Sequence, residues 1–264
     1  MKRNSNKKPK LGQHFLTDLR YKKIIIDYVH NLGIKNILEV GPGTGSITLD
    51  LVKYSTNFLG IELDKKLYLD LINKYRDGNT DFLNLDAGLF NIDDHDFFQD
   101  PYLLVGNLPY YSANMIVRNF ITATFKPKYL IIMIQKEVAD NYLSSVPKMK
   151  FLGHSIQTYS KVEKITDVPK EAFNPEPNVI SSIILLETKK DNEIIGEPEK
   201  LLSFIKKGFS APRKTLVNSL SLSLKIDKRL LSNELIKINI DPKLRPGNLE
   251  NNDWLKIFNT IIEL

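Results

Sequence analysis

The sequence predicts an α/β protein in which a doubly wound, mostly parallel sheet is followed by a small all-helical C-terminal domain. Up to Gln135, short apolar runs alternate with amphipathic segments, which is typical of parallel strands connected by helices. Several of these runs end directly at a glycine or a polar residue, where ligands bind in open α/β sheets. Beyond residue 188, apolar residues recur at helical spacing.

The first predicted strand, 36–40, opens into the glycine-rich stretch Gly41-Pro42-Gly43-Thr44-Gly45, and a helix is expected to begin within 46–52. Glycines here allow a tight turn and a close approach of the backbone to a ligand. A dinucleotide-binding fingerprint requires a third glycine where this chain has Ser46. The G-x-G-x-G form, preceded by the acidic Glu39, favours S-adenosylmethionine, which has no pyrophosphate. We therefore expect a Rossmann-like cofactor site that includes Gly41 and Gly43.

Two further predicted strands end at acidic residues. The run 57–61 ends at Glu62, about 20 residues after the first glycine, where a carboxylate that holds ribose hydroxyls is expected. The run 80–85 leads to Asp86 and Ala87, and Asp86 can accept a hydrogen bond from the amino group of the cofactor's adenine. Either residue alone could be a surface or loop residue. Together with the glycine stretch, they predict one cofactor-binding edge of the sheet.

The segment Gly106-Asn107-Leu108-Pro109-Tyr110 follows the apolar run 102–105. The exocyclic nitrogen of adenine is a poor nucleophile because its lone pair is delocalised into the ring. Two hydrogen-bond acceptors can localise that lone pair, namely the Asn107 side-chain oxygen and the carbonyl of Leu108 or Pro109. Tyr110 offers a stacking face worth roughly 1–3 kcal/mol per base. The segment therefore predicts methyl transfer to an adenine amino group. The alternative is that it has only a structural role, as a turn with an aromatic anchor.

With these motifs the chain resembles the KsgA/RsmA family of ribosomal RNA small-subunit adenine dimethyltransferases. The resemblance covers almost the whole chain and rests on these segments: 11–16, 39–45, 60–64, 106–110, 135–139, 172–179, 208–209, 213–215 and 218–220. One segment departs from the family pattern. Relatives usually have Tyr-Gly followed closely by Leu-Ser where this chain has Met149-Lys150-Phe151-Leu152-Gly153-His154-Ser155, so no substrate contact is carried over from the family to this segment.

The resemblance implies a function and a set of site residues. Methyl groups from S-adenosylmethionine would pass to N6 of two adjacent adenines in a hairpin loop near the 3′ end of small-subunit RNA. Phe173 would clamp the target adenine opposite Tyr110, and the nearby Pro175 and Pro177 indicate that it lies on a rigid loop. The cofactor's methionine and adenosine parts would contact His14, Leu16, Gly41, Glu62, Asp86 and Asn107.

Composition agrees with a nucleic-acid substrate. The chain of 264 residues has a formal net charge of +6 and no cysteine. Residues 1–10 hold five basic residues and no acidic one, and 200–229 hold eight basic residues against Asp227 alone. Such clusters favour contact with RNA phosphates, although single lysines commonly just solvate helix faces. The four histidines lack metal-ligand spacing, so no metal site is expected. Because no apolar run resembles a signal peptide or a membrane span, we expect a cytoplasmic protein without membrane contact.

We expect residues 1–188 to form the catalytic domain, with 1–10 as a basic flexible tail, and 189–264 to form a helical RNA-binding domain. The runs 155–168 and 178–187 are expected to complete the sheet as an antiparallel pair. The substrate is expected to be a pre-30S-type particle and the enzyme a monomer. Three alternatives remain: a large-subunit methyltransferase of the macrolide-resistance type, a non-catalytic nucleic-acid-binding relative such as a mitochondrial transcription factor, and a nicotinamide-dependent oxidoreductase. The segment 208–220 favours the small-subunit group over the first.

Overall fold

A computed structural model describes residues 13–95, 98, 100–194 and 196–262. The chain forms two compact units, one of residues up to Ala139 together with Glu163–Thr188, and one of Asp140–Val162 together with Lys189–Leu264. A single division after residue 188 was expected from the sequence, so the structure adds 140–162 to the helical part. The expected basic tail, 1–10, lies outside the described residues.

The first unit is built on a seven-stranded sheet with the order β4-β3-β2-β5-β6-β9-β7. Neighbours from β4 to β6 are parallel, whereas β9 runs antiparallel to β6. This mostly parallel sheet and the helical C-terminal part confirm the predicted fold class. The strands are β2 (Asn36–Val40), β3 (Asn57–Ile61), β4 (Thr80–Leu83), β5 (Tyr102–Asn107), β6 (Tyr129–Gln135), β7 (Ser160–Val168) and β9 (Ser181–Thr188).

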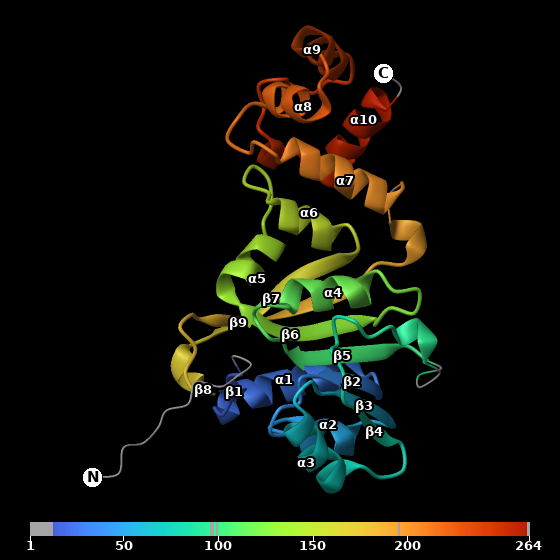
Figure 1. Ribbon diagram of the computed structural model, residues 1–264, viewed down its shortest axis with the longest axis vertical. Coiled ribbons are helices and arrows are strands. Elements are labelled where there is room, and N and C mark those ends of the chain that lie inside the picture. Colours follow the sequence, from blue (N-terminus) through green and yellow to red (C-terminus); the bar gives the residue numbers. More distant parts are fainter. Residues whose placement is uncertain (1–12, 96–97, 99, 195, 263–264) are drawn as a thin grey trace, which may run out of the picture. The chain divides into compact units, whose positions relative to one another are not determined.

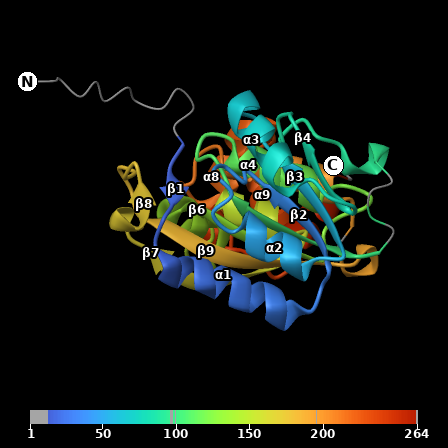
Figure 2. The same cartoon turned by 90° about the horizontal axis from the view of Figure 1, so that it is seen from below.

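Helices cover both faces of this sheet. Buried side chains of α1 (Leu19–Leu32), α2 (Thr48–Tyr54) and α3 (Lys65–Tyr75) share one core with alternate strand residues such as Ile37 and Phe58. Because successive side chains of a strand point to opposite faces, Leu38 and Leu59 belong to the other face. Figures 1 and 2 show α4 (Ala113–Ile121) on the opposite side of the sheet from α1.

The order of the strands fixes where a ligand can bind. The chain winds outward from β2 to β3 and β4, then returns to place β5 on the other side of β2. At this reversal the carboxyl ends of β2 and β5 lie side by side, with Val40 paired to Gly106. Loops diverge above such a switch point and leave a crevice between them. The glycine stretch after β2 and the Asn107 segment after β5 therefore border the same crevice.

A second, two-stranded sheet joins distant parts of the first unit. In it, β1 (Phe15–Leu16) pairs antiparallel with β8 (Phe173–Asn174), so that Leu16 lies opposite Phe173. The pairing continues as hydrogen bonds from the Thr17 backbone N–H and hydroxyl to the Ala172 carbonyl, at 2.8 and 3.1 Å. It places Gln13, His14 and Phe15 beside the crevice.

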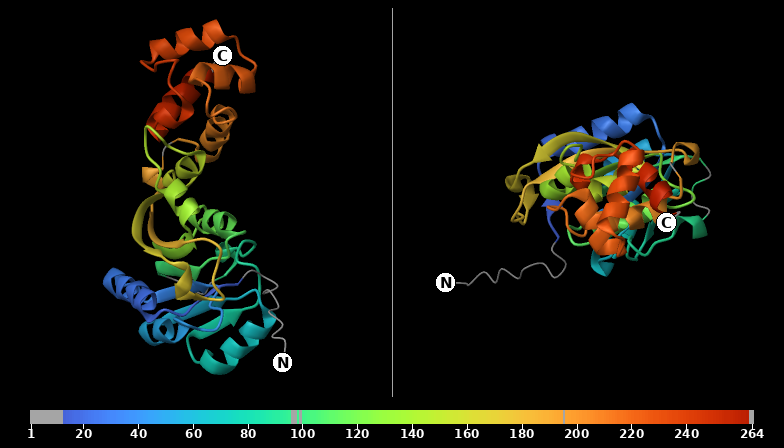
Figure 3. Two further views of the ribbon diagram at one scale, coloured as in Figure 1. Left: turned by 90° about the vertical axis from the view of Figure 1, so that its left-hand side faces the viewer. Right: turned by 90° about the horizontal axis from the view of Figure 1, so that it is seen from above.

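The second unit is helical, with its later helices drawn in orange and red in Figure 3. The helices are α6 (Phe151–Gln157), α7 (Pro198–Gly208), α8 (Leu216–Leu224), α9 (Lys228–Lys237) and α10 (Asn251–Ile261), while α5 (Lys136–Tyr142) leads into the unit. Residues 155–157, expected in a strand, therefore lie in α6, and the strand begins at Ser160. Short 3₁₀ turns occur at Ile92–Asp94, Lys170–Ala172, Asp191–Glu193 and Pro246–Asn248.

Trp254 of α10 is fully buried in this unit. A Cβ atom at Gly208 would lie 2.2 Å from the Trp254 ring, so this position of α7 admits no side chain. His154, in the segment that departs from the family pattern, meets the same ring edge-on at 6.3 Å, and its Nδ1 bonds the Asn251 side-chain oxygen. Because these contacts involve α6, they explain why 140–162 joins the helical unit.

Candidate active site

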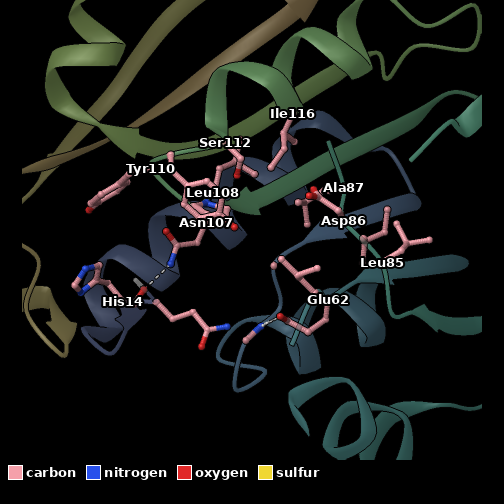
Figure 4. A pocket seen from close by; sticks show the side chains of 18 of the residues that line it. His14, Glu62, Leu85, Asp86, Ala87, Asn107, Leu108, Tyr110, Ser112 and Ile116 are labelled. Carbon is pink, nitrogen blue, oxygen red and sulfur yellow. Dashed lines mark hydrogen bonds between the residues drawn. The ribbon is translucent and has the colours of Figure 1, made fainter. Parts of the chain in front are cut away.

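A cleft lies at the carboxyl ends of β2, β3, β4 and β5. Figure 4 shows side chains from these strand ends converging on it. The cleft is lined by nine of the site residues predicted from the sequence, namely His14, Gly41, Gly43, Glu62, Asp86, Ala87, Asn107, Pro109 and Tyr110. It lies wholly within the first unit.

The glycine stretch forms a tight cradle at one wall of the cleft. Gly41, Gly43 and Gly45 have φ angles of +70°, +61° and +81°, a region that side-chain-bearing residues rarely adopt. A Cβ atom at Gly43 would lie 2.9 Å from the Phe15 ring, and one at Gly41 would lie 3.2 Å from the Asn107 carbonyl oxygen. Side chains at these positions would therefore crowd the Phe15 ring and the Asn107 backbone, which form the adjoining wall of the cleft.

Glu62 holds this cradle in place from the end of β3. Its Oε2 accepts a hydrogen bond from the Gly43 N–H at 2.9 Å, drawn as a dashed line in Figure 4, and its Oε1 accepts one from the Asp64 N–H at 2.9 Å. Burial raises the pKa of Glu62, and these backbone N–H groups oppose that rise. Each oxygen keeps a second lone pair, so the carboxylate can also accept ribose hydroxyls.

Asp86 lies across the cleft from the glycine cradle, after β4. Its Oδ1 accepts the Gly88 N–H at 2.8 Å, which fixes the side chain and leaves Oδ2 free to accept a ligand N–H. Leu63, Leu85 and Ile116 line the cleft around the two carboxylates and supply apolar walls. Two anchored carboxylates between apolar walls are suited to an adenosine, with acceptors for both its ribose and its amino group.

Glu39 does not line this cleft, although it precedes the glycine stretch. It is 2% exposed and accepts a hydrogen bond from the Thr48 hydroxyl at 2.7 Å. Burial, together with a smaller contribution from the negative charge of Glu62, raises its pKa to about 8 in spite of that hydrogen bond. The sequence identified Glu39 as part of the motif, and the structure makes it a buried support behind the loop.

Asn107 is oriented by the backbone of His14. Its Nδ2 donates to the His14 carbonyl at 2.9 Å, shown in Figure 4, so its Oδ1 is the atom left to accept. The Pro109 carbonyl accepts two N–H groups at the start of α4, from Ser112 at 3.1 Å and Ala113 at 2.9 Å. The Leu108 carbonyl accepts no hydrogen bond from the residues that the structure describes. Of the two carbonyls considered from the sequence, Leu108 is therefore the available acceptor.

Two contacts fix the ring of Tyr110. Its hydroxyl shares a 2.7 Å hydrogen bond with the hydroxyl of the buried Ser181, and the His14 ring stacks against it with centroids 5.9 Å apart. His14 is held in turn, because its Nδ1 donates to the Pro175 carbonyl at 2.8 Å. Burial raises the pKa of Tyr110, so its hydroxyl stays protonated at neutral pH.

The structure does not bring Leu16 and Phe173 to the cleft. They face each other in the β1–β8 pair, are 4% and 3% exposed, and belong to the core beneath the sheet. Phe173 was expected to be a stacking residue on a rigid loop, and its burial corrects that expectation. Leu16 instead lines a smaller pocket next to Glu39 and Ile25.

Some residues at the cleft were not identified from the sequence. Gln13 and Phe15 line it next to His14, and Tyr111 and Ser112 line it after Tyr110. Their position directly beside identified motifs was the available signal. Ser181 had no such signal, because its contact with Tyr110 joins residues 71 positions apart. In the described part of the chain, no group of three or more His, Asp or Glu side chains is placed to hold a metal ion, and no helix is long and apolar enough to cross a membrane.

Comparison with known proteins agrees with this arrangement. Residues 4–263 match the family described as ribosomal RNA adenine dimethylase. The ribosomal RNA small subunit methyltransferase A of Campylobacter fetus subsp. fetus (strain 82-40) is 36% identical over 261 residues, which cover 95% of this chain and 93% of that protein.

Two solved structures share the fold over most of the chain. A dimethyladenosine transferase from Plasmodium falciparum has a TM-score of 0.78 at 23% identity, with 95% of this chain and 98% of that one covered. The 23S rRNA methyltransferase ErmE has a TM-score of 0.71 at 21% identity, with 94% and 99% covered. Since the family match spans nearly the whole sequence and the predicted motifs meet in one cleft, this chain belongs to the ribosomal RNA adenine dimethylase family.

Proposed function

We propose that this protein transfers methyl groups from S-adenosylmethionine to N6 of adenine in small-subunit ribosomal RNA, giving N6,N6-dimethyladenosine. The substrate is two adjacent adenines in a hairpin loop near the 3′ end of the RNA. The observation that carries the proposal is the orientation of Asn107, whose Nδ2 is held by the His14 carbonyl while Oδ1 and the Leu108 carbonyl remain free to accept. Relatives named as small-subunit methyltransferases support the choice of RNA.

The residues of the cleft fit the cofactor. Gly41 and Gly43 leave room for a ligand against the backbone, Glu62 would accept the ribose hydroxyls, and Asp86 would accept the adenine amino group. His14, Ala87 and Asn107 complete the wall. When bound, S-adenosylmethionine supplies a methyl group on a positively charged sulfur, which a nucleophile can accept with release of the neutral thioether. No described residue is required as a strong base.

The chain's own contribution is to prepare the adenine nitrogen. Oδ1 of Asn107 and the carbonyl of Leu108 would accept the two N6 hydrogens and so favour a pyramidal nitrogen with a localised lone pair. The anchored ring of Tyr110 would stack on the extruded base. The proton released from N6 can pass to water. After the first transfer N6 keeps one hydrogen, so a single acceptor suffices for the second.

The helical segment 189–264 is proposed to bind RNA. Lys206 and Lys207 of α7 and Arg213 and Lys214 before α8 are exposed, and none of the four forms an ion pair within the described residues. Free guanidinium and ammonium groups on one segment favour phosphate contacts. We further propose that the enzyme acts as a monomer in the cytoplasm on a pre-30S-type particle.

The test is methyl transfer with labelled cofactor to small subunits that lack the modification, followed by mapping of the modified nucleotides. We expect label in dimethyladenosine at two adjacent positions near the 3′ end. Label in large-subunit RNA would instead favour the macrolide-resistance type of enzyme. Cofactor binding without transfer to any RNA would favour a non-catalytic relative, and binding of NAD in place of S-adenosylmethionine would refute the cofactor assignment.

A further inference from the structure

The segment after Asn107 carries two adjacent tyrosines with opposite surroundings. Tyr110 and Tyr111 are the two central residues of a turn closed by the hydrogen bond from the Ser112 N–H to the Pro109 carbonyl at 3.1 Å. The Tyr110 ring is held inside the cleft by Ser181 and His14. Tyr111 also lines the cleft, yet it is 68% exposed. Its ring therefore lies at the mouth of the cleft.

The exposure of Tyr111 is exceptional in this protein. Among the described residues, every other Phe, Tyr and Trp side chain is buried or half-buried. An aromatic ring left in water costs free energy that folding normally recovers by burial. The turn that carries it is rigid, because the Pro109 carbonyl also accepts the Ala113 N–H at the start of α4. A ring on such a turn loses little conformational entropy when a flat ligand stacks on it.

Two further exposed apolar side chains belong to segments that border the cleft. Met115, in the first turn of α4, is 46% exposed and lies against Gly88, where a Cβ atom would be 2.2 Å from the Met115 methyl group. Leu89, which follows the cleft-lining Asp86–Ala87 loop, is 81% exposed. Exposed aromatic and apolar side chains on segments that border the cleft are better suited to the face of a base than to a phosphate.

We propose that Tyr111 is a stacking platform for the nucleotide next to the target adenine. This inference rests on the proposed function. When an adenine leaves its stack and enters the cleft, the adjacent base loses a stacking partner, and one phosphodiester link keeps that base close to the mouth. The Tyr111 ring replaces the lost partner, while Tyr110 serves the target base. The two tyrosines thus bind two consecutive nucleotides from one turn, which makes Tyr111 a determinant of substrate specificity for unpaired RNA.

The test compares Tyr111→Ala, Tyr111→Leu and Tyr111→Phe with wild-type enzyme in methyl transfer to unmethylated small subunits. A stacked base is worth about 1–3 kcal/mol, so Tyr111→Ala should lower kcat/KM by roughly 5- to 150-fold. Tyr111→Leu should lose most of the same activity because it keeps apolar area without an aromatic face. Tyr111→Phe should stay within about twofold of wild type. The dissociation constant of the cofactor should not change in any variant.

The matched control is Leu69→Ala on α3, a 44% exposed apolar residue that does not line the cleft, for which kcat/KM should stay at the wild-type value. Tyr111→Ala with wild-type kcat/KM, or Tyr111→Leu as active as Tyr111→Phe, would overturn the platform while leaving the proposed function intact. A wild-type enzyme that binds the cofactor but methylates no RNA would refute the proposed function itself, and the platform with it.

Discussion

Replacement of Glu39 by glutamine is expected to change how the stability of the protein depends on pH. Glu39 is 2% exposed, its hydrogen-bond donor is the Thr48 hydroxyl, and burial raises its pKa from an ordinary value of 4.5 to about 8. Between these two pH values the folded protein keeps a proton on Glu39 that the unfolded chain releases. The stabilisation from this group is therefore complete below pH 4.5 and is lost as the pH rises through 8.

The size of the effect follows from the separation of the two pKa values. A separation of about 3.5 units, at about 1.4 kcal/mol per unit, corresponds to about 5 kcal/mol of unfolding free energy lost by the wild type between pH 4.5 and pH values above 8. In Glu39→Gln the side chain is neutral in both states, and its amide oxygen still accepts from Thr48. The unfolding free energy of the variant, relative to that of the wild type, should therefore rise by several kcal/mol between pH 5 and pH 9.

The assay is urea unfolding followed by circular dichroism at pH 5, 7 and 9 for both proteins. Glu163→Gln, which changes an exposed carboxylate on β7, is the matched control and should follow the wild-type curve. If the unfolding free energies of Glu39→Gln and wild type run parallel from pH 5 to 9, Glu39 is not a proton-binding buried group and the argument fails.

Three further single substitutions and one combined neutralisation separate catalytic, structural and RNA-binding roles. Asn107→Ala should lower single-turnover methylation by at least ~100-fold, about 2.7 kcal/mol of barrier, with little loss in a cofactor titration; near-normal turnover would contradict the mechanism. Phe173→Ala should lower the unfolding free energy by roughly 3–5 kcal/mol in urea, as a core residue does, and an unchanged value would contradict its burial. Ser181→Ala should slow transfer by up to roughly tenfold without changing cofactor affinity, because Tyr110 loses its hydroxyl partner; a weaker cofactor affinity would argue against that reason. The fourth test neutralises Lys206, Lys207, Arg213 and Lys214 together. A plot of the logarithm of the RNA-binding constant against the logarithm of the salt concentration should become less steep by nearly one unit for each lost contact to duplex RNA. An unaltered slope would mean that these residues only solvate the surface.

The sequence could predict the cleft because its main parts are local. Gly41, Glu62, Asp86 and Asn107 each lie at or shortly after the end of a strand, and parallel strands bring their carboxyl ends to one edge. Knowing where the strands end was therefore enough to place these residues together. The sequence left open whether the Leu108 or the Pro109 carbonyl is the second acceptor. The structure decides this, because the Pro109 carbonyl already accepts N–H groups at the start of α4.

The residues that were misplaced depend on long-range pairing. Phe173 lies in the core opposite Leu16 because β8 pairs with β1, a contact between segments more than 150 residues apart that leaves no local pattern. The prolines that follow Phe173 indicated a loop and gave no information on where its ring would lie. In the same way, the contact of Ser181 with Tyr110 depends on the antiparallel pairing of β9 with β6, in which Ser181 lies opposite Gln135.

The division of the chain into two units limits which fragments of the protein could fold separately. The backbone passes from one unit to the other three times, after Ala139, Val162 and Thr188, and the first two passages lie within α5 and β7. A single cut after Thr188 would therefore separate no intact unit. The fragment 1–188 would retain α6 with His154 but lose Asn251 and Trp254, which contact that ring. Because the backbone crosses between the units three times, neither unit is a single continuous segment, and the two have to be expressed as one chain. The three covalent connections also keep each unit at a high effective concentration for the other.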